Sequence, residues 1–288
     1  MARKIYGKKV KGASHVRSGM PCQDNFRIER IGKDLSIIAV ADGHGSEKSP
    51  KSKNGSQIAV NVFCHVMNEY LMNYNDSVDR LITYLNRDGQ IRFAQYICSE
   101  WQKRVRDSFK NTKEECALDD EGKPEWNEVY RLYGTTLLGL LITNTYVFAF
   151  QIGDGDIVLV DGRSISPVVE TEKILGTETH SLSSKDPWKN AVSIVMKRDA
   201  DADLPYLYML STDGFVNSYA SQADYEKTCR DYYDMIGEHG FDKVCENLEN
   251  WLTETSELGC GDDITLVLAY FDDEESGFGT EVSDMQRD

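Results

Sequence analysis

Apolar runs and apolar–polar periodicity alternate along the chain, and they predict strands and helices in a definite order. Short apolar runs bounded by turn residues are typical of buried strands. We expect such strands at residues 5–10, 26–31, 35–41, 135–142, 146–152, 157–160, 192–196, 206–210 and 264–271. Apolar spacing near the helical period predicts helices at 54–74, from residue 76 with a break at 88–89, at 222–236 and at 241–253. The polar segment 14–25 between the first two strands is expected to be a loop.

The grouping of these elements favours an α+β fold. Helices come in pairs between strands that hairpins connect, unlike the regular alternation of a parallel sheet. We therefore expect a four-layer α-β-β-α sandwich of two antiparallel sheets flanked by helix pairs. Residues 1–271 read as a single domain, with a hydrophilic excursion at 110–127. Residues 272–288 are acidic and lack periodicity, which predicts a disordered tail.

Four acidic turns adjoin apolar runs and suggest one metal site. Asp42, Asp154 and Asp213 each follow an expected strand, whereas Asp262 precedes the last one. If that last strand is antiparallel to the others, all four carboxylates meet at one rim of the sheets. Like charges held this close oppose folding unless hard divalent cations compensate them. A single Asp-Gly pair more often forms an ordinary turn than a metal site. However, Asp42 and Asp213 are followed by helical segments rather than by a second strand of a hairpin.

Composition narrows the function classes. The net charge of −16 argues against nucleic acid as the main partner, because phosphate backbones are bound by clustered Lys and Arg. Seven cysteines form no CxxC pair, so we expect free thiols and a cytoplasmic protein. The uncharged stretch 132–153 is interrupted by Thr, Asn and Gln, and we expect a hairpin there rather than a membrane span. A monomer is the expected state.

The motifs QDNF, VADGHG, GTTLLGL, QIGDGD, LSTDGF and GDDITLVL occur in this order. Together they resemble the PP2C-type metal-dependent protein serine/threonine phosphatases, the PPM family, in a bacterial-like variant. The resemblance covers nearly everything from residue 12 to residue 270. It implies that a hydroxide bridging two Mn²⁺ or Mg²⁺ ions attacks phosphorus, with a phosphoprotein as substrate and a Ser/Thr kinase circuit as the setting. Paired divalent ions lower the pKa of water and neutralise phosphoryl charge, so no protein nucleophile is needed.

The resemblance assigns metal ligands residue by residue. Asp42 would bridge both ions, and the carbonyl of Gly43 would serve one of them. Asp213 and Asp262 would hold the other, and Asp154 with Asp213 would form a looser third site. Gly43 suits its role because a glycine lets the backbone approach closely.

Further roles follow from the same resemblance. His44 matches the general acid that protonates the departing seryl or threonyl oxygen, although a His bonded to a carboxylate is the simpler interpretation. Family members commonly have Glu-Asp where this chain has Gln23-Asp24. Gln23 carries no charge, so Asp24 alone would supply a carboxylate next to the metal ligands. Arg17 is the nearest candidate for the phosphate-binding Arg, but it lies two residues farther upstream than usual. The segment 171–190 stands where the family carries a variable flap.

Three other functions fit the sequence less well. A catalytically weak regulatory or binding module on the same fold would be expected to lack a principal carboxylate, and none is missing. A calcium-binding loop at 154–156 lacks the further oxygen ligands that an EF-hand requires. A two-metal nuclease conflicts with the acidic charge balance.

Overall fold

The computed structural model describes residues 2–32, 34–74, 77–112, 118, 122–170, 180–197 and 204–272. Within these ranges the strands form two antiparallel sheets. The first has the order β1 (Ala2–Val10), β10 (Ile264–Asp272), β9 (Tyr206–Ser211), β6 (Asp156–Asp161) and β7 (Ile165–Pro167). The second has the order β2 (Asn25–Ile31), β3 (Leu35–Ala41), β4 (Leu137–Ile142), β5 (Tyr146–Ile152) and β8 (Val192–Lys197).

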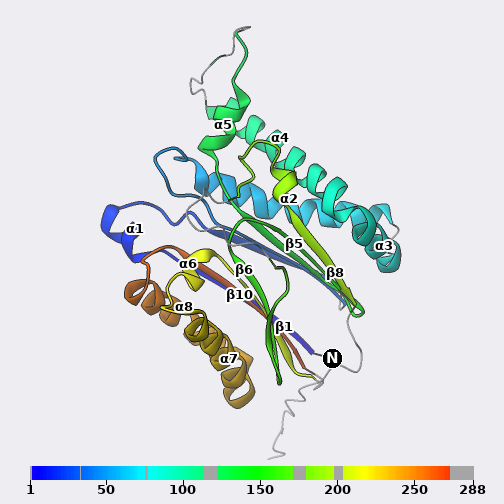
Figure 1. The fold of residues 1–288 in the computed structure, drawn as a ribbon, viewed down its shortest axis with the longest axis vertical. Coiled ribbons are helices and arrows are strands. Elements are labelled where there is room, and N and C mark those ends of the chain that lie inside the picture. Colours follow the sequence, from blue (N-terminus) through cyan, green and yellow to red (C-terminus); the bar gives the residue numbers. More distant parts are fainter. Residues whose placement is uncertain are drawn as a thin grey trace, which may run out of the picture.

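Helices cover the outer face of each sheet (Figure 1). Over the second sheet lie α2 (Ser52–Asn73), α3 (Val78–Asp88), the π-helical turn η1 (Gly89–Phe93), α4 (Ala94–Thr112) and α5 (Trp126–Leu132). Over the first lie α7 (Gln222–His239) and α8 (Phe241–Leu258). The short helices α1 (Ala13–Ser18) and α6 (Asp213–Val216) lie together at one end of the sandwich, and the 3₁₀ turn η2 (Pro187–Asn190) precedes β8. The predicted four-layer α-β-β-α fold is confirmed.

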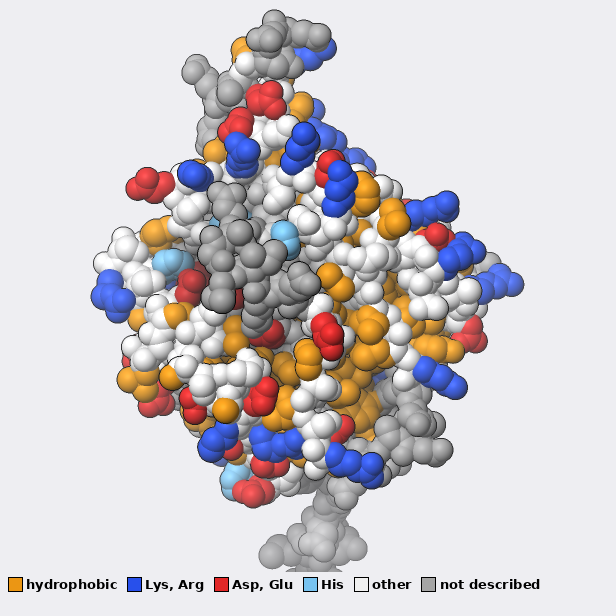
Figure 2. Space-filling model, viewed as in Figure 1, with side chains coloured by type: hydrophobic (Ala, Val, Ile, Leu, Met, Phe, Trp, Pro, Cys, Tyr) orange, Lys and Arg blue, Asp and Glu red, His pale blue; other side chains and the backbone are white. Residues whose placement is uncertain are grey.

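The central strands are apolar throughout because both of their faces are buried. In β3, Ile38 and Val40 pack between the two sheets, whereas Ile37 and Ala39 pack under the helices. Side chains alternate between the faces of a strand, so a continuous apolar run is what a strand with two covered faces requires. Figure 2 shows one face of the molecule, where Lys, Arg, Asp and Glu side chains lie mostly around the periphery and hydrophobic side chains gather below and to the right of the centre.

Close backbone contacts hold the helices of the second sheet in place. A Cβ atom at Gly55 of α2 would lie 1.8 Å from the carbonyl oxygen of Tyr133, and one at Gly139 of β4 would lie 2.2 Å from the Phe63 ring. Only glycine permits either approach. The indole Nε1 of Trp101 on α4 donates to the Gly55 carbonyl at 3.1 Å, so α2 and α4 are also joined by a buried hydrogen bond.

Several expectations need correction. The loop expected at 14–25 begins with the helix α1, and the break expected at 88–89 is a π-helical turn that connects α3 to α4. The excursion expected at 110–127 contains the end of α4 and the start of α5, while residues 113–117 and 119–121 lie outside the described residues. So do 171–179 of the expected flap and 273–288 of the expected tail.

Two sequence expectations about the chain as a whole can be compared with the structure. In the ranges given above, no helix is long and apolar enough to cross a membrane, and the stretch 132–153 contains the β4–β5 hairpin. The cysteines of the described part, at positions 22, 64, 98, 229, 245 and 260, are free thiols as expected.

Candidate active site

The acidic turns meet at one end of the sandwich because of how the strands pair. In the second sheet Asn25 pairs with Ala41, so Asp24, just before β2, lies beside Asp42, just after β3. In the first sheet Leu266 pairs with Ser211, so the start of β10 lies beside the end of β9. The prediction that the last strand is antiparallel to its neighbour is therefore correct, and it places Asp262 next to Asp213.

Asp42 is the point at which the segments converge. Its side chain is only partly accessible, and burial raises the pKa of its carboxyl well above the usual value. The carboxylates of Asp24, Asp213 and Asp262 add to this increase in the pKa of Asp42, in that order. Since such interactions require proximity, the structure brings four of the predicted site residues together.

Asp213 connects this group to Asp154. Burial raises the pKa of Asp213 to about 6, and Asp154 and Asp262 are the next largest causes. Asp213 begins α6, and the side-chain amide of Asn217 donates to its Oδ2 at 3.0 Å. Asp262 reaches solvent, yet desolvation by the surrounding protein raises its pKa as well, with the backbone N–H of Asp263 acting in the opposite direction.

Asp24 is fully buried and joins the two sheets. Its Oδ2 accepts hydrogen bonds from the hydroxyls of Thr212 and Thr265, both at 2.8 Å. Its Oδ1 is buried and receives no N–H or alcohol hydroxyl from the described residues. Burial raises the pKa of Asp24 to about 7, and the carboxylate of Asp263 adds to the increase. A buried carboxyl with an open oxygen is suited to a cation.

Backbone contacts fix the loop that follows β3. The carbonyl of Asp42 accepts hydrogen bonds from the Thr136 N–H at 2.9 Å and from the Thr135 hydroxyl at 2.6 Å. A Cβ at Gly43 would lie 2.9 Å from the carbonyl oxygens of Gln23 and Ser52, so no larger residue fits there without a shift. His44 is half-buried, and its N–H donates to the Gly134 carbonyl at 3.2 Å.

Two residues at this end were not assigned any role from the sequence, namely Asp263 and His15. The buried carboxylate of Asp263 accepts from the backbone N–H groups of Gly12 at 2.6 Å and Gln23 at 2.7 Å. His15 Nδ1 of α1 lies 2.9 Å from Asp263 Oδ1. The pair therefore ties α1 to the loop that carries Asp262. The doublet Asp262-Asp263 is the only signal in the sequence that points to Asp263.

Arg17 lies on the exposed side of the same helix. Its guanidinium Nη2 is 3.6 Å from where a Cβ of Gly261 would be, one residue before Asp262. The left-handed backbone of Gly261, with φ of 80°, and the bond from the Ser14 N–H to its carbonyl at 2.9 Å hold α1 against this loop. α1 thus places the predicted Arg17 at the same end of the sandwich as the carboxylates.

The donor set has the chemistry that hard divalent cations prefer. It consists of carboxylate oxygens, among them the buried Asp24 Oδ1, together with the carbonyl of Gly43. In the described part of the chain, no group of three or more His, Cys, Asp or Glu side chains is arranged closely enough to hold an ion without other ligands. Mg²⁺ usually keeps several waters and takes only one or two carboxylates, so an oxygen-only set of this kind fits it.

The fold and this acidic end define a metal-dependent hydrolase class, and comparison with known proteins gives the family. A family model described as protein phosphatase 2C matches residues 11–253. The chain therefore belongs to the protein phosphatase 2C family, and the prediction of a protein phosphatase is confirmed. No match was found among curated proteins.

Solved structures of bacterial phosphatases share the fold. Stp1, a serine/threonine phosphatase from Staphylococcus aureus, is 11% identical with a TM-score of 0.58, and the match covers 94% of this chain and 96% of that one. The catalytic domain of PstP in complex with two manganese ions is 12% identical with a TM-score of 0.56, covering 94% and 99%. RsbX in complex with magnesium is 12% identical with a TM-score of 0.51, covering 93% and 94%. At such identities the likeness establishes the fold.

Proposed function

We propose that this protein hydrolyses phosphoserine and phosphothreonine in proteins with the help of two Mn²⁺ or Mg²⁺ ions. The observation that carries the proposal is the pairing of β2 with β3 and of β9 with β10, which brings four acidic turns to one end of the sandwich. The effect of Asp24, Asp213 and Asp262 on the pKa of Asp42 agrees with it. Sequence family membership and the manganese and magnesium found with PstP and RsbX support the same cofactor.

Different residues at the acidic end of the sandwich would bind different ions. Asp42 would contact both ions, the Gly43 carbonyl one of them, and Asp213 with Asp262 the other. Asp154, which also raises the pKa of Asp213, would complete a third and looser site. When bound, the ions would supply the attacking hydroxide and would neutralise charge on the phosphoryl oxygens. Asp24 would position Asp42 from its buried place between the sheets.

Two side chains would act on the substrate directly. The imidazole of His44 would donate a proton to the departing seryl or threonyl oxygen, which is a poor leaving group as an alkoxide. The guanidinium of Arg17 would bind the phosphoryl group, for which its forked donors are well matched. We also propose that the protein is a cytoplasmic monomer that opposes a Ser/Thr kinase.

A phosphatase assay with two classes of substrate tests this function. With added Mn²⁺ the purified protein should release phosphate from a phosphothreonine peptide and from an aryl phosphate, and a chelator should stop both reactions. Asp42→Asn and Asp213→Asn should each reduce kcat by at least about a hundredfold, as expected when transition-state charge loses its stabilisation. Activity that survives these substitutions would show that the reaction takes place elsewhere, and a stable, correctly folded wild type without activity would favour a regulatory module.

The role of His44 has its own test. His44→Ala should slow the phosphothreonine peptide far more than an aryl phosphate, because a phenolate leaves without a proton while an alkoxide does not. An equal effect on both substrates would exclude the acid role.

A further inference from the structure

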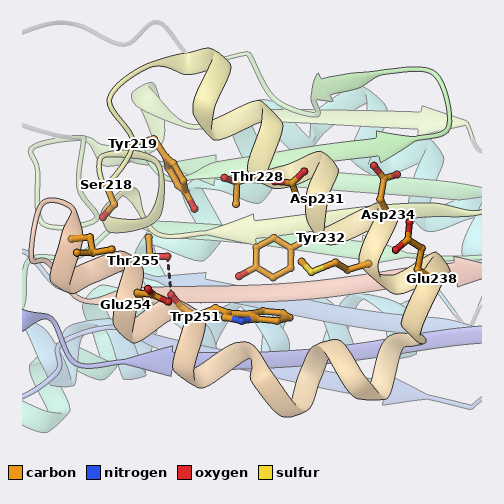
Figure 3. Close-up of a pocket in the computed structure, with 12 residues that line it drawn as sticks. Ser218, Tyr219, Thr228, Asp231, Tyr232, Asp234, Glu238, Trp251, Glu254 and Thr255 are labelled. Carbon is orange, nitrogen blue, oxygen red and sulfur yellow. Dashed lines mark hydrogen bonds between the residues drawn. The ribbon is translucent and has the colours of Figure 1, made fainter.

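A groove runs between the two outer helices α7 and α8, outside the cluster of Asp24, Asp42, Asp213 and Asp262. Its volume is about 740 Å³, and Figure 3 shows the residues that line it. The α6–α7 connection closes one end with Ser218 and Tyr219, and Glu238 stands toward the other end. Within the described residues nothing covers it, and neither Lys nor Arg lines it.

The floor of the groove is aromatic. Tyr232 on α7 and Trp251 on α8 meet edge to face, with ring centroids 5.8 Å apart, and Tyr219 extends this surface at the closed end. Met235 and Leu258 add apolar surface, and Leu258 is 82% exposed. Aromatic faces attract Lys and Arg side chains as well as apolar groups.

The rim is acidic. Glu254 on α8 stands at the closed end of the groove, Asp234 and Glu238 on α7 stand toward the other end, and all three are exposed to solvent. Asp231, the fourth acid, already pairs with Lys227 at 2.8 Å. Residues 222–258 contain ten Asp and Glu against three Lys and Arg, a net charge of −7 out of −16 for the whole chain of 288 residues. Together with residues 272–288, which carry a net charge of −6, this helix pair accounts for most of the negative charge of the chain.

The closed end of the groove adjoins the candidate active site. Ser218 Oγ donates to the Gly214 carbonyl at 2.7 Å and lies 3.3 Å from Cys260 Sγ. Gly214 follows Asp213, and Cys260 is two residues before Asp262. A peptide lying in the groove would leave it within a few residues of both proposed metal ligands.

We propose that this groove docks a basic segment of the phosphoprotein substrate, one in which Lys or Arg alternates with apolar residues. The positive side chains would face Asp234, Glu238 and Glu254, and the apolar ones would lie on Tyr232 and Trp251. The inference rests on the proposed function for its biological meaning, but binding in the groove is measurable without any catalysis. The lining from Thr228 to Glu238 spans about 15 Å of helix, the length of roughly five extended residues.

Direct binding is the first test. A fluorescein-labelled, unphosphorylated peptide of alternating Arg and Leu is titrated with the full-length protein in chelator, and its anisotropy is recorded. The double variant Asp234→Lys with Glu254→Lys should weaken binding by about tenfold, because the attraction becomes a repulsion at two points. The matched control, Glu226→Lys with Glu246→Lys, makes the same change in net charge on exposed residues of the same helices outside the groove. It should change the Kd by less than about twofold, because these two side chains do not line the groove and cannot pair with the peptide's Lys or Arg there.

Kinetics then relate the groove to the reaction. In each protein we measure kcat/KM for two phosphothreonine peptides, one with the basic segment and one without it. The quantity compared is the ratio of the first value to the second. We expect a ratio well above one in the wild type and in the control, and a ratio near one in the groove variant. A Glu–Leu segment in place of the basic one should give no increase.

Each result decides the inference. Equal weakening in the groove variant and the control would overturn it, because the overall field rather than the groove would then attract the peptide. Equal binding of the acidic and basic peptides would also overturn it. If the wild type binds the basic peptide in the groove but hydrolyses no phosphopeptide, the docking site stands and the proposed function fails.

Discussion

Replacing Asp24 with Asn removes one carboxylate from the buried cluster and keeps the shape of the side chain. In the wild type the hydroxyls of Thr212 and Thr265 donate to Asp24 at 2.8 Å. The Asn Oδ1 can accept the same two hydrogen bonds, and the Asn amide can donate toward Asp42. Burial raises the pKa of Asp24 from 3.8 to about 7, so this carboxyl lowers the stability of the folded state progressively between these two pH values and by the full amount above pH 7. By linkage this difference corresponds to at most about 4 kcal/mol, and we expect roughly half of it because the neighbouring carboxyls relax together.

Urea unfolding in chelator measures the effect. At pH 8 we expect Asp24→Asn to raise the free energy of unfolding by about 2 kcal/mol, and near pH 4 the gain should vanish because the wild-type carboxyl is protonated. A control with the opposite sign is Asp161→Asn. Burial acts to raise the pKa of Asp161, but hydrogen bonds from the Arg163 and Ser164 N–H groups lower it overall, so this variant should be destabilised at pH 8. Equal destabilisation by Asp24→Asn at both pH values would refute the charge argument.

Three further predictions can be checked with standard assays. Without metal, the melting temperature should fall by several degrees as pH rises from 5 to 8, because Asp24 and Asp213 have raised pKa values and their charged forms destabilise the native state; a flat profile would contradict this. Gly55→Ala should lower the free energy of unfolding by more than about 2 kcal/mol because its Cβ would meet the Tyr133 carbonyl, whereas Gly237→Ala, with open space around it, should raise it by up to about 1 kcal/mol. His15→Ala should lower kcat/KM because it removes the imidazole that lies 2.9 Å from Asp263 and packs α1 against the loop, and His15→Asn, which keeps a polar side chain there, should recover part of the activity; identical kinetics for the two variants would exclude a positioning role.

The strands and the acidic turns were predictable because their signals are local. Both faces of β3 and β5 are covered, so their apolar runs are unbroken, and the expected ranges 35–41 and 146–152 agree with the structure. Placing Asp262 beside Asp213 needed one inference about strand direction, and the pairing of β9 with β10 supports it.

The remaining features depend on tertiary contacts that leave little trace in the sequence. α1 has six residues, fewer than two helical turns, which is too short for an apolar repeat to be recognised, and it is held by the Gly261 carbonyl and by Asp263. The π-helical turn η1 looks like a break in the apolar pattern because it shifts the period by one residue. Asp263 is buried under backbone donors from Gly12 and Gln23, which no spacing rule connects to it.

The central claim is that Asp42, Asp213 and Asp262 hold a pair of divalent ions, and Mn²⁺ binding followed by electron paramagnetic resonance tests it most directly. The wild type should bind two Mn²⁺ ions tightly, with spectra showing that the two are close to each other. Asp42→Asn should abolish that pairing, and the exposed control Glu226→Gln should not. Unchanged pairing in Asp42→Asn, or only one tightly bound ion in the wild type, would contradict the account.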